Sequence, residues 1–285
     1  MHWEAYHCVE SIEEALQLLD EYAGASRVIA GGTDLVIQLK NHQRRVKALV
    51  SLSSIKALRY IEQDGETIRI GALSTHNELA KSDLLMEKAK ALSLAARAVG
   101  SPQIRNIGTV GGNIVNAQPA ADTAIALLAL GAKAKIVSST GERVEVLENL
   151  FKGIGESSVN PAKEIVTEFI FPAFFRSAFQ RLALRKAFTL PIINVAVALL
   201  IDQKNICREA RIAIGPVSTV PFRAKKAEAI LNNEIISEKK LVLAAAEAMR
   251  EINPRDSLLR GSAMYRRAMV KVLLERALRD AVVVK

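Results

Sequence analysis

The chain has 285 residues, 50% of them hydrophobic, with a formal net charge of +9 and two cysteines; this is enough apolar sequence for about two domains with buried cores. Cys8 and Cys207 are too few for an iron–sulfur cluster, lack the spacing of a zinc site, and are expected to be free thiols. The basic residues are scattered and aromatic residues make up only 5% of the chain, which argues against nucleic-acid binding and favours an acidic partner subunit or an anionic cofactor.

The N-terminal part predicts helices and short strands that lead into a pair of glycines. Ser11 and Glu14 have the spacing of a capping box, which indicates the start of a helix. A short apolar strand then runs directly into Gly31 and Gly32. The expected elements are a helix at 11–22, a strand at 27–30, a helix or loop at 35–40 and a strand at 48–52.

The middle part predicts a longer helix, a loop and several strands. Apolar residues four and three apart indicate one amphipathic helix at 85–99, closed by Gly100 with Pro102 beyond it. A second glycine cluster is expected in a loop, and a segment rich in glycine and small polar residues is the best linker candidate. The expected elements are strands at 67–70, 134–138, 142–147 and 165–171, a helix at 123–130 and the linker at 152–163.

Beyond about Phe174 the pattern of predicted elements changes to antiparallel strands followed by helices. Two apolar strands, at 192–202 and 210–215, are expected to pair antiparallel, and three helices follow near 223–231, 237–251 and 262–279. We therefore expect an α+β protein in two parts. The first part is residues 1–172, with lobes at about 1–55 and 56–172, and the second is residues 173–285, with a small antiparallel sheet and helices.

Two glycine clusters carry the strongest functional signal. The first is Val28–Leu35 (VIAGGTDL), and the second is Asn106–Asn113 (NIGTVGGN). Adjacent glycines let backbone N–H groups approach a ligand with no Cβ in the way, and successive N–H groups form a nest that holds phosphates. Two such nests predict a dinucleotide ligand. Neither cluster has Rossmann or Walker A spacing, and the first cluster alone is also compatible with a tight turn in which Asp34 caps a helix.

Taken together, these segments resemble the FAD-binding subunits of the molybdenum hydroxylases, the family of xanthine, carbon monoxide and nicotinate dehydrogenases. The matching segments are Ala30–Leu35, Ile70–His76, Asn106–Asn113, Ala117–Asp122, Pro221–Ala224 and Arg260–Arg266. The resemblance covers nearly the whole chain. It implies a two-lobed FAD-binding domain of the PCMH/vanillyl-alcohol-oxidase type, followed by the C-terminal domain of the molybdenum-hydroxylase flavoproteins.

The resemblance implies FAD as the cofactor and assigns both glycine loops to it. Backbone donors of the first loop would wrap the FAD pyrophosphate. The second loop would form the opposite wall, with the Thr109 hydroxyl donating to a phosphate oxygen. The residues assigned in the two loops are Val28, Ile29, Ala30, Gly31, Gly32, Thr33, Asp34, Leu35, Gly108, Thr109, Gly111, Gly112, Asn113 and Asn116.

Further residues outside the loops are assigned to the cofactor by the same resemblance. Asp122 would accept hydrogen bonds from ribityl or adenosine hydroxyls, or would serve only as a helix cap. Ile165 and Val166 would pack near the flavin or the adenine, or would be ordinary strand core. Arg185 and Lys186 belong to a basic stretch that would lie close to the flavin, or would be solvated at the surface.

The implied function is electron transfer within a complex. Substrate would be oxidised on a molybdenum-cofactor subunit, electrons would cross a [2Fe–2S] subunit, and this chain would pass them through FAD to NAD+ or another acceptor. No catalytic residue and no metal ligand is expected here. A self-sufficient FAD oxidoreductase and a non-catalytic assembly protein without flavin are the alternatives. With no targeting segment and no apolar run of the ~20 residues that insertion into a membrane needs, we expect a cytoplasmic protein.

Overall fold

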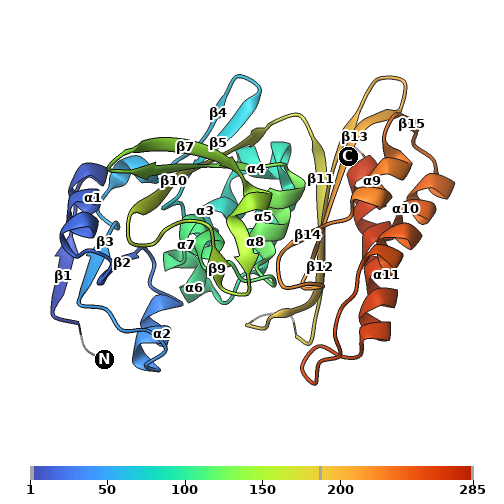
Figure 1. Cartoon of the computed structure of the whole chain (residues 1–285). Coiled ribbons are helices and arrows are strands. Elements are labelled where there is room, and N and C mark those ends of the chain that lie inside the picture. Colours follow the sequence, from blue (N-terminus) through green and yellow to red (C-terminus); the bar gives the residue numbers. More distant parts are fainter. Residues whose placement is uncertain (1–2, 186–187, 284–285) are drawn as a thin grey trace.

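Three larger β-sheets, each packed against its own helices, follow one another along the chain (Figure 1). The computed structural model describes residues 3–185 and 188–283. This arrangement confirms the expected α+β class, with an antiparallel sheet and helices at the C-terminal end. Within the described residues, no helix has the length and apolar character that crossing a membrane requires.

The first sheet lies in the N-terminal part of the chain. Its elements are β1 (Ala5–Cys8), α1 (Ile12–Glu21), β2 (Ser26–Ile29), α2 (Leu35–Lys40) and β3 (Ala48–Ser51). The strands are parallel, in the order β1-β3-β2. The central strand β3 is buried along its length, because Val50 packs on the α1 side and Leu49 on the α2 side.

The start of α1 shows how the expected capping pattern is used. The Ser11 hydroxyl accepts a hydrogen bond from the backbone N–H of Glu14 at 3.1 Å. The Glu14 carboxylate accepts from the N–H of Glu10 at 2.9 Å rather than from Ser11. The helix therefore starts where the sequence predicts, but the reciprocal half of the capping box reaches one residue further back.

The second sheet is antiparallel and forms the centre of the molecule. The part of the chain that contains it has the 3₁₀ turn η1 (Lys56–Leu58), β4 (Ile61–Asp64), β5 (Thr67–Gly71), α3 (His76–Lys81), α4 (Asp83–Lys88), α5 (Lys90–Ala98), α6 (Pro102–Ile107), α7 (Val110–Val115), α8 (Asp122–Ala129), β6 (Lys133–Ser138), β7 (Gly141–Val146), η2 (Leu147–Leu150), β8 (Phe151–Gly153), β9 (Glu156–Ser157) and β10 (Glu164–Pro172). Strands β8 and β9 pair only with each other. The strand order is β4-β5-β10-β6-β7. The helices bury one face of this sheet, with Phe169 and Phe171 of β10 inside the core.

Three expectations for the middle part are corrected by the structure. The helix expected at 85–99 is divided into α4 and α5 because Ala89 leaves the helical region, with φ −143°. Gly111 and Gly112 lie inside α7, not in a loop. The expected linker at 152–163 instead contains the β8–β9 hairpin, which lies within the first part of the chain.

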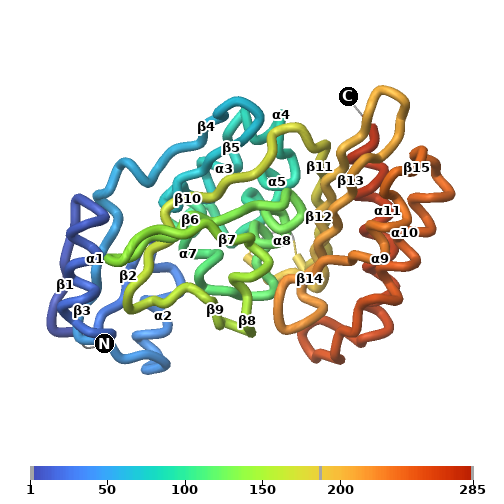
Figure 2. Tube along the Cα trace, turned by 45° about the horizontal axis from the view of Figure 1, so that its top comes forward, coloured from blue at the N-terminus to red at the C-terminus, as the bar shows by residue number. Residues whose placement is uncertain are grey.

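The third sheet begins the C-terminal part and stands between two groups of helices. Its elements are β11 (Arg176–Ala183), β12 (Pro191–Ile201), β13 (Ile206–Gly215), β14 (Phe222–Arg223), α9 (Lys225–Leu231), β15 (Glu234–Ile235), α10 (Glu238–Glu251) and α11 (Ala263–Val282). The path β11-β12-β13-β14 is antiparallel, and β15 also pairs with β13. Figures 1 and 2 show this sheet with α10 and α11 on one side and α5 and α8 on the other.

The alternation along β12 explains why it is buried on both faces. Val195, Val197 and Leu199 belong to the core that contains α10 and α11. Ala196 and Ala198 belong to the core of the central helices. Successive side chains of a strand point to opposite faces, so the small residues face the first part of the chain and the larger ones the C-terminal helices. The apolar run from Val195 to Ile201 of β12 follows from this position.

Arg211 of β13 ties the third sheet to the end of α8. Its Nη1 donates a hydrogen bond to the carbonyl of Leu130 at 2.7 Å, and its guanidinium lies 4.3 Å from the ring centroid of Phe175. Gly131 has φ +69°, and a Cβ there would overlap the Arg211 guanidinium. The glycine that ends α8 is therefore needed both for its backbone conformation and for the space that Arg211 occupies.

A buried ionic contact joins the same two parts at the start of α8. The Asp122 carboxylate is 5% exposed, accepts from Nδ2 of Asn194 at 2.7 Å, and lies 3.2 Å from Nε of Arg181. Burial raises the pKa of Asp122 to about 6, while the charge of Arg181 and the hydrogen bond from Asn194 oppose the rise.

The stability of the chain should therefore depend on pH through Asp122. Between about pH 4 and pH 6 the folded chain holds a proton on Asp122 that the unfolded chain has released, so the free energy of unfolding falls as pH rises through this window, by about 3 kcal/mol in total. Urea unfolding of the ligand-free chain and of its Asp122→Asn variant, which has no such proton, measures this change. The stability of wild type relative to the variant should decrease from pH 4 to pH 7. If the difference in unfolding free energy between wild type and variant stays constant over this range, the pKa of Asp122 is not raised in the folded chain.

Candidate functional site

A cleft of about 420 Å³ opens where the two glycine segments meet, a volume within the range of about 300–1,000 Å³ that is usual for small-molecule sites. It is lined by the loop after β2, by α2 and α7, by β10 and by the β9 segment. The lining includes nearly all residues that the sequence assigns to the cofactor: Val28, Ile29, Ala30, Gly31, Gly32, Thr33, Asp34, Leu35, Gly108, Thr109, Gly111, Gly112, Asn113, Asn116, Ile165 and Val166.

The first loop offers a row of backbone donors to the cleft. Within the described residues, no backbone N–H from Ala30 to Leu35 donates a hydrogen bond to a protein acceptor. Gly32 has φ +68°, a conformation that side chains with a Cβ rarely adopt. Polar N–H groups that find no acceptor in the protein suit an anionic ligand such as a phosphate.

Gly31 is also needed for a backbone contact that the sequence does not reveal. A Cβ on Gly31 would overlap the backbone carbonyl of Ile107. Gly31 therefore lets the first loop touch the segment before α7, backbone against backbone. Gly31 and Gly108 both line the cleft, so this contact lies at its wall.

The two adjacent glycines of the second segment, Gly111 and Gly112, have different surroundings. The N–H of Gly111 donates to the carbonyl of Ala72 at 2.9 Å, and a Cβ on Gly111 would lie 2.7 Å from that oxygen. Gly112 is different, because a Cβ there would meet only the Thr109 hydroxyl, at 3.1 Å. Gly111 thus packs on Ala72, the residue that follows β5, whereas Gly112 leaves an open surface toward the cleft.

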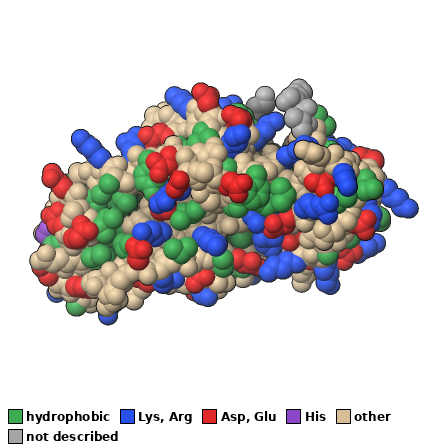
Figure 3. All heavy atoms as spheres, turned by 90° about the horizontal axis from the view of Figure 1, so that it is seen from above, with side chains coloured by type: hydrophobic (Ala, Val, Ile, Leu, Met, Phe, Trp, Pro, Cys, Tyr) green, Lys and Arg blue, Asp and Glu red, His purple; other side chains and the backbone are tan. Residues whose placement is uncertain are grey.

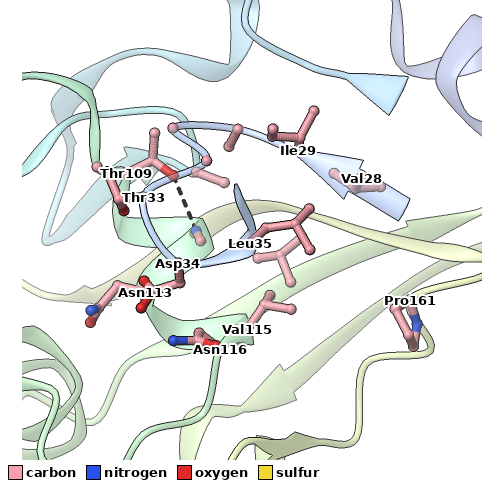
Figure 4. Close-up of a pocket in the computed structure, with 18 of the residues that line it drawn as sticks. Val28, Ile29, Thr33, Asp34, Leu35, Thr109, Asn113, Val115, Asn116 and Pro161 are labelled. Atoms are coloured by element: carbon pink, nitrogen blue, oxygen red, sulfur yellow. Dashed lines mark hydrogen bonds between the residues drawn. The ribbon is translucent and has the colours of Figure 1, made fainter. Parts of the chain in front are cut away.

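Thr109 is held in place by its own helix. Its Oγ1 accepts a hydrogen bond from the N–H of Gly112 at 3.1 Å, as the dashed line in Figure 4 shows. Accepting this bond leaves the hydroxyl proton free to donate elsewhere. The hydroxyl of Thr123 fixes Asn113 by donating to its Oδ1 at 2.7 Å.

The cleft has a polar side and an apolar side. Figure 4 shows Thr33, Thr109 and Asn113 on one side, and Val28, Leu35 and other apolar side chains on the other. Burial raises the pKa of the Asp34 carboxyl, and a hydrogen bond from Asn116 opposes this shift. The arrangement suits a ligand with a charged segment and an extended ring system.

His76 also lines the cleft, and it is uncharged at neutral pH. Its side chain is buried, and burial, assisted by the charge of Arg105, lowers its pKa to about 4. Its Nδ1 is buried without a hydrogen-bond partner among the described residues. The imidazole therefore adds polarity but no positive charge to the wall.

Several lining residues were missed by the sequence analysis. Arg27 and Arg44 both line the cleft, and burial together with the charge of Arg44 lowers the pKa of Arg27. The segment 155–161, expected to belong to a linker, contributes Gly155, Ser157 and Pro161. Arg27 could have been noticed because it begins the strand that leads into the glycine pair. The segment 155–161 approaches only through tertiary folding.

Two other expected residues, Asp122 and Arg185, are absent from the lining of this cleft. Asp122 lies at the contact between the two parts of the chain, bound by Arg181 and Asn194. Arg185 is exposed and donates through Nε to the carbonyl of Phe188 at 3.2 Å. Lys186 lies outside the described residues. Cofactor roles for Asp122, Arg185 and Lys186 stay predictions.

Two family models together match almost the entire chain. Residues 2–174 match the FAD binding domain in molybdopterin dehydrogenase, and residues 177–281 match the CO dehydrogenase flavoprotein C-terminal domain. Among curated proteins, the chain is 36% identical to the nicotinate dehydrogenase FAD-subunit of Eubacterium barkeri over 228 residues, which are 78% of this chain and 77% of that protein. It is 31% identical to the xanthine dehydrogenase FAD-binding subunit of Escherichia coli O157:H7 over 284 residues, 98% of this chain and 96% of that protein.

The solved structures agree with the family models. A chain of carbon monoxide dehydrogenase from Hydrogenophaga pseudoflava superposes with a TM-score of 0.91 at 28% identity, covering 98% of this chain and 97% of that one. The free N–H groups of the first loop and the open surface at Gly112 fit the diphosphate of FAD. The chain therefore belongs to the FAD-binding subunits of the molybdenum hydroxylases, and its cofactor is FAD.

Proposed function

We propose that this chain is the electron-transfer subunit of a molybdenum hydroxylase complex. It would accept electrons from a [2Fe–2S] subunit, which receives them from a molybdenum-cofactor subunit, and deliver them to NAD+ or another acceptor. FAD supplies the redox chemistry when bound, while the chain binds and orients it. Residues 1–172 would form the FAD-binding domain and residues 173–285 the C-terminal domain. The observation that carries the proposal is the cleft with its two glycine segments, together with relatives that are FAD-binding subunits or medium chains of dehydrogenases.

The two loops would bind the diphosphate from opposite sides. The N–H groups from Ala30 to Leu35 would donate to phosphate oxygens from one side. The Thr109 hydroxyl would donate from the other side, over the open surface of Gly112. Arg27 and Arg44 would neutralise part of the phosphate charge.

Anaerobic mixing of the FAD-loaded chain with the reduced [2Fe–2S] subunit of its complex tests this function. The visible absorbance of bound flavin should decrease on mixing and recover when NAD+ or another electron acceptor is added. Turnover of an organic substrate by the isolated chain would instead favour a self-sufficient oxidoreductase. A folded chain that takes up no flavin would favour an assembly protein.

Filling the open surface at Gly112 should abolish FAD retention. A leucine side chain in the Gly112→Leu variant would extend into the space over the second wall, where a Cβ meets only the Thr109 hydroxyl. Flavin released by acid from the purified variant should fall from about equimolar to near zero, while the circular dichroism spectrum and the thermal midpoint of the FAD-free chain stay close to wild type. Normal flavin content in this variant would contradict the assignment of the loop.

Gly31→Ala provides the contrast to Gly112→Leu. Its Cβ overlaps the Ile107 carbonyl, which cannot move without displacing the backbone. We expect this variant to lose FAD and also to lower the thermal midpoint of the FAD-free chain, because it disturbs packing rather than the ligand surface alone.

The neighbouring residues Arg44 and Arg45 form a matched pair for testing the charge of the cleft. Arg44 lines the cleft and Arg45 does not, although both are exposed. Arg44→Gln should weaken FAD binding by about three- to tenfold, as expected for loss of a partly screened cation–phosphate contact, and the effect should shrink at high salt. Arg45→Gln should leave the dissociation constant of FAD unchanged. Equal effects of the two variants, measured by fluorescence titration of FAD, would show that only the net charge matters.

A further inference from the structure

A second cleft, of about 870 Å³, lies between α1 and the outer face of the second sheet. Lys135 and Val137 of β6 line it, whereas their neighbours Ala134 and Ile136 point into the central core. Glu168 of β10 lines it in the same way, next to Phe169 in the core. The cleft is therefore on the face of the sheet opposite to the central helices, and none of its lining residues belongs to the lining of the FAD cleft.

The rim of this cleft is acidic, although the chain carries a net charge of +9. The carboxylates of Glu13, Asp20 and Glu21 come from α1, and that of Glu142 from β7. The basic residue among the lining side chains, Lys135, lies 2.7 Å from Glu142 and compensates that one charge. Figure 3 shows this face, where Asp and Glu side chains surround apolar ones at the α1 end.

A buried carboxylate with a free acceptor atom also lines this cleft. Glu168 is only 4% exposed. Its Oε1 accepts from Nη2 of Arg69 at 2.7 Å and from the hydroxyl of Tyr60. Its Oε2 is buried with no hydrogen-bond partner among the described residues. Buried carboxylate oxygens nearly always accept a hydrogen bond. Oε2 of Glu168 can therefore accept a hydrogen bond from a ligand.

The Arg69 guanidinium is shared rather than dedicated to Glu168. It also lies 4.0 Å from Glu62 and 3.7 Å from Asp64, and it is partly exposed. The single positive charge of Arg69 is therefore shared among the carboxylates of Glu62, Asp64 and Glu168. The neighbourhood of Glu168 keeps an excess of negative charge.

The inner surface of the cleft is apolar. Leu16 and Leu58 are buried, and Ile12 and Val137 are partly buried. An aliphatic stem with a cationic head matches an apolar surface bordered by carboxylates, as long basic side chains do. Within the described residues, no three His, Cys, Asp or Glu side chains are grouped as ligands of a metal ion. The composition of the surface thus favours an organic cation.

We propose that the cleft between α1 and the second sheet binds an organic cation, an ammonium or guanidinium group on an aliphatic stem, with Glu168 as its hydrogen-bond acceptor and the α1 carboxylates as its rim. The same chemistry is present in free polyamines and in lysine or arginine side chains of another protein. The site is separate from the FAD cleft, so its occupation does not require the proposed electron transfer.

Calorimetric titration of the FAD-loaded chain with 1,5-diaminopentane tests the proposal, with 1,5-pentanediol as the uncharged probe of the same length. The diamine should bind saturably and more weakly at high salt, and the diol should not bind. Glu168→Gln keeps the shape of the side chain and should weaken diamine binding at least about tenfold, because a charge-assisted hydrogen bond is lost. Asp20→Asn, at the exposed rim, should weaken it about two- to fivefold.

Glu87→Gln is the matched control, because Glu87 lies on α4 outside the cleft and is paired with Lys88. It should bind the diamine like wild type. The flavin content and thermal midpoint of each variant report whether it is folded. Nα-acetyl-lysine amide distinguishes the sources: binding tighter than the diamine indicates a protein side chain, and weaker binding indicates a free polyamine. No saturable binding of either cation, or binding unaffected by both Glu168→Gln and Asp20→Asn, would overturn the proposal.

Discussion

The contact between the two glycine segments is the constraint on which the cofactor cleft depends. Gly31 meets the carbonyl of Ile107 at a distance that leaves no room for a Cβ, and Gly111 meets Ala72 in a similar way. The first contact brings the first sheet against the central helices, and the second holds α7 against the end of β5. The residues from Ala30 to Leu35 line the cleft, and their N–H groups find no acceptor within the described part of the chain. The glycines that build the walls are thus distinct from Gly112, which keeps the ligand surface open.

The C-terminal part is attached to the same framework through α8. Arg211 binds the end of this helix, and the Arg181–Asp122–Asn194 cluster binds its start. Both contacts are polar and at least partly buried, and they fix α8 along its axis against the third sheet. The alanine face of β12 adds close apolar packing between them. Because α7 precedes α8 and Asn113 is bonded to Thr123, the position of the second glycine segment is coupled to the third sheet.

Local patterns predicted much of this fold and of the site. The strand that enters Gly31, the cap of α1 and the end of α8 at Gly131 depend on residues close in sequence, and they lie where expected. The break at Ala89 and the helical conformation of Gly111 depend on packing against distant elements, which local propensity does not contain. Arg44 and the hairpin at Gly155 reach the cleft only through the tertiary fold. Asp122 was assigned by resemblance, and its partners Arg181 and Asn194 come from another sheet.

Hydrogen–deuterium exchange of the chain with and without saturating FAD observes the backbone donors of the first loop themselves. FAD should slow exchange in the peptide that contains residues 30–35, where the amides have no acceptor among the described residues. A smaller effect is expected near Thr109, and none in α1 at the acidic cleft. Unchanged exchange at residues 30–35 under full FAD occupancy would contradict the claim that these N–H groups hold the diphosphate.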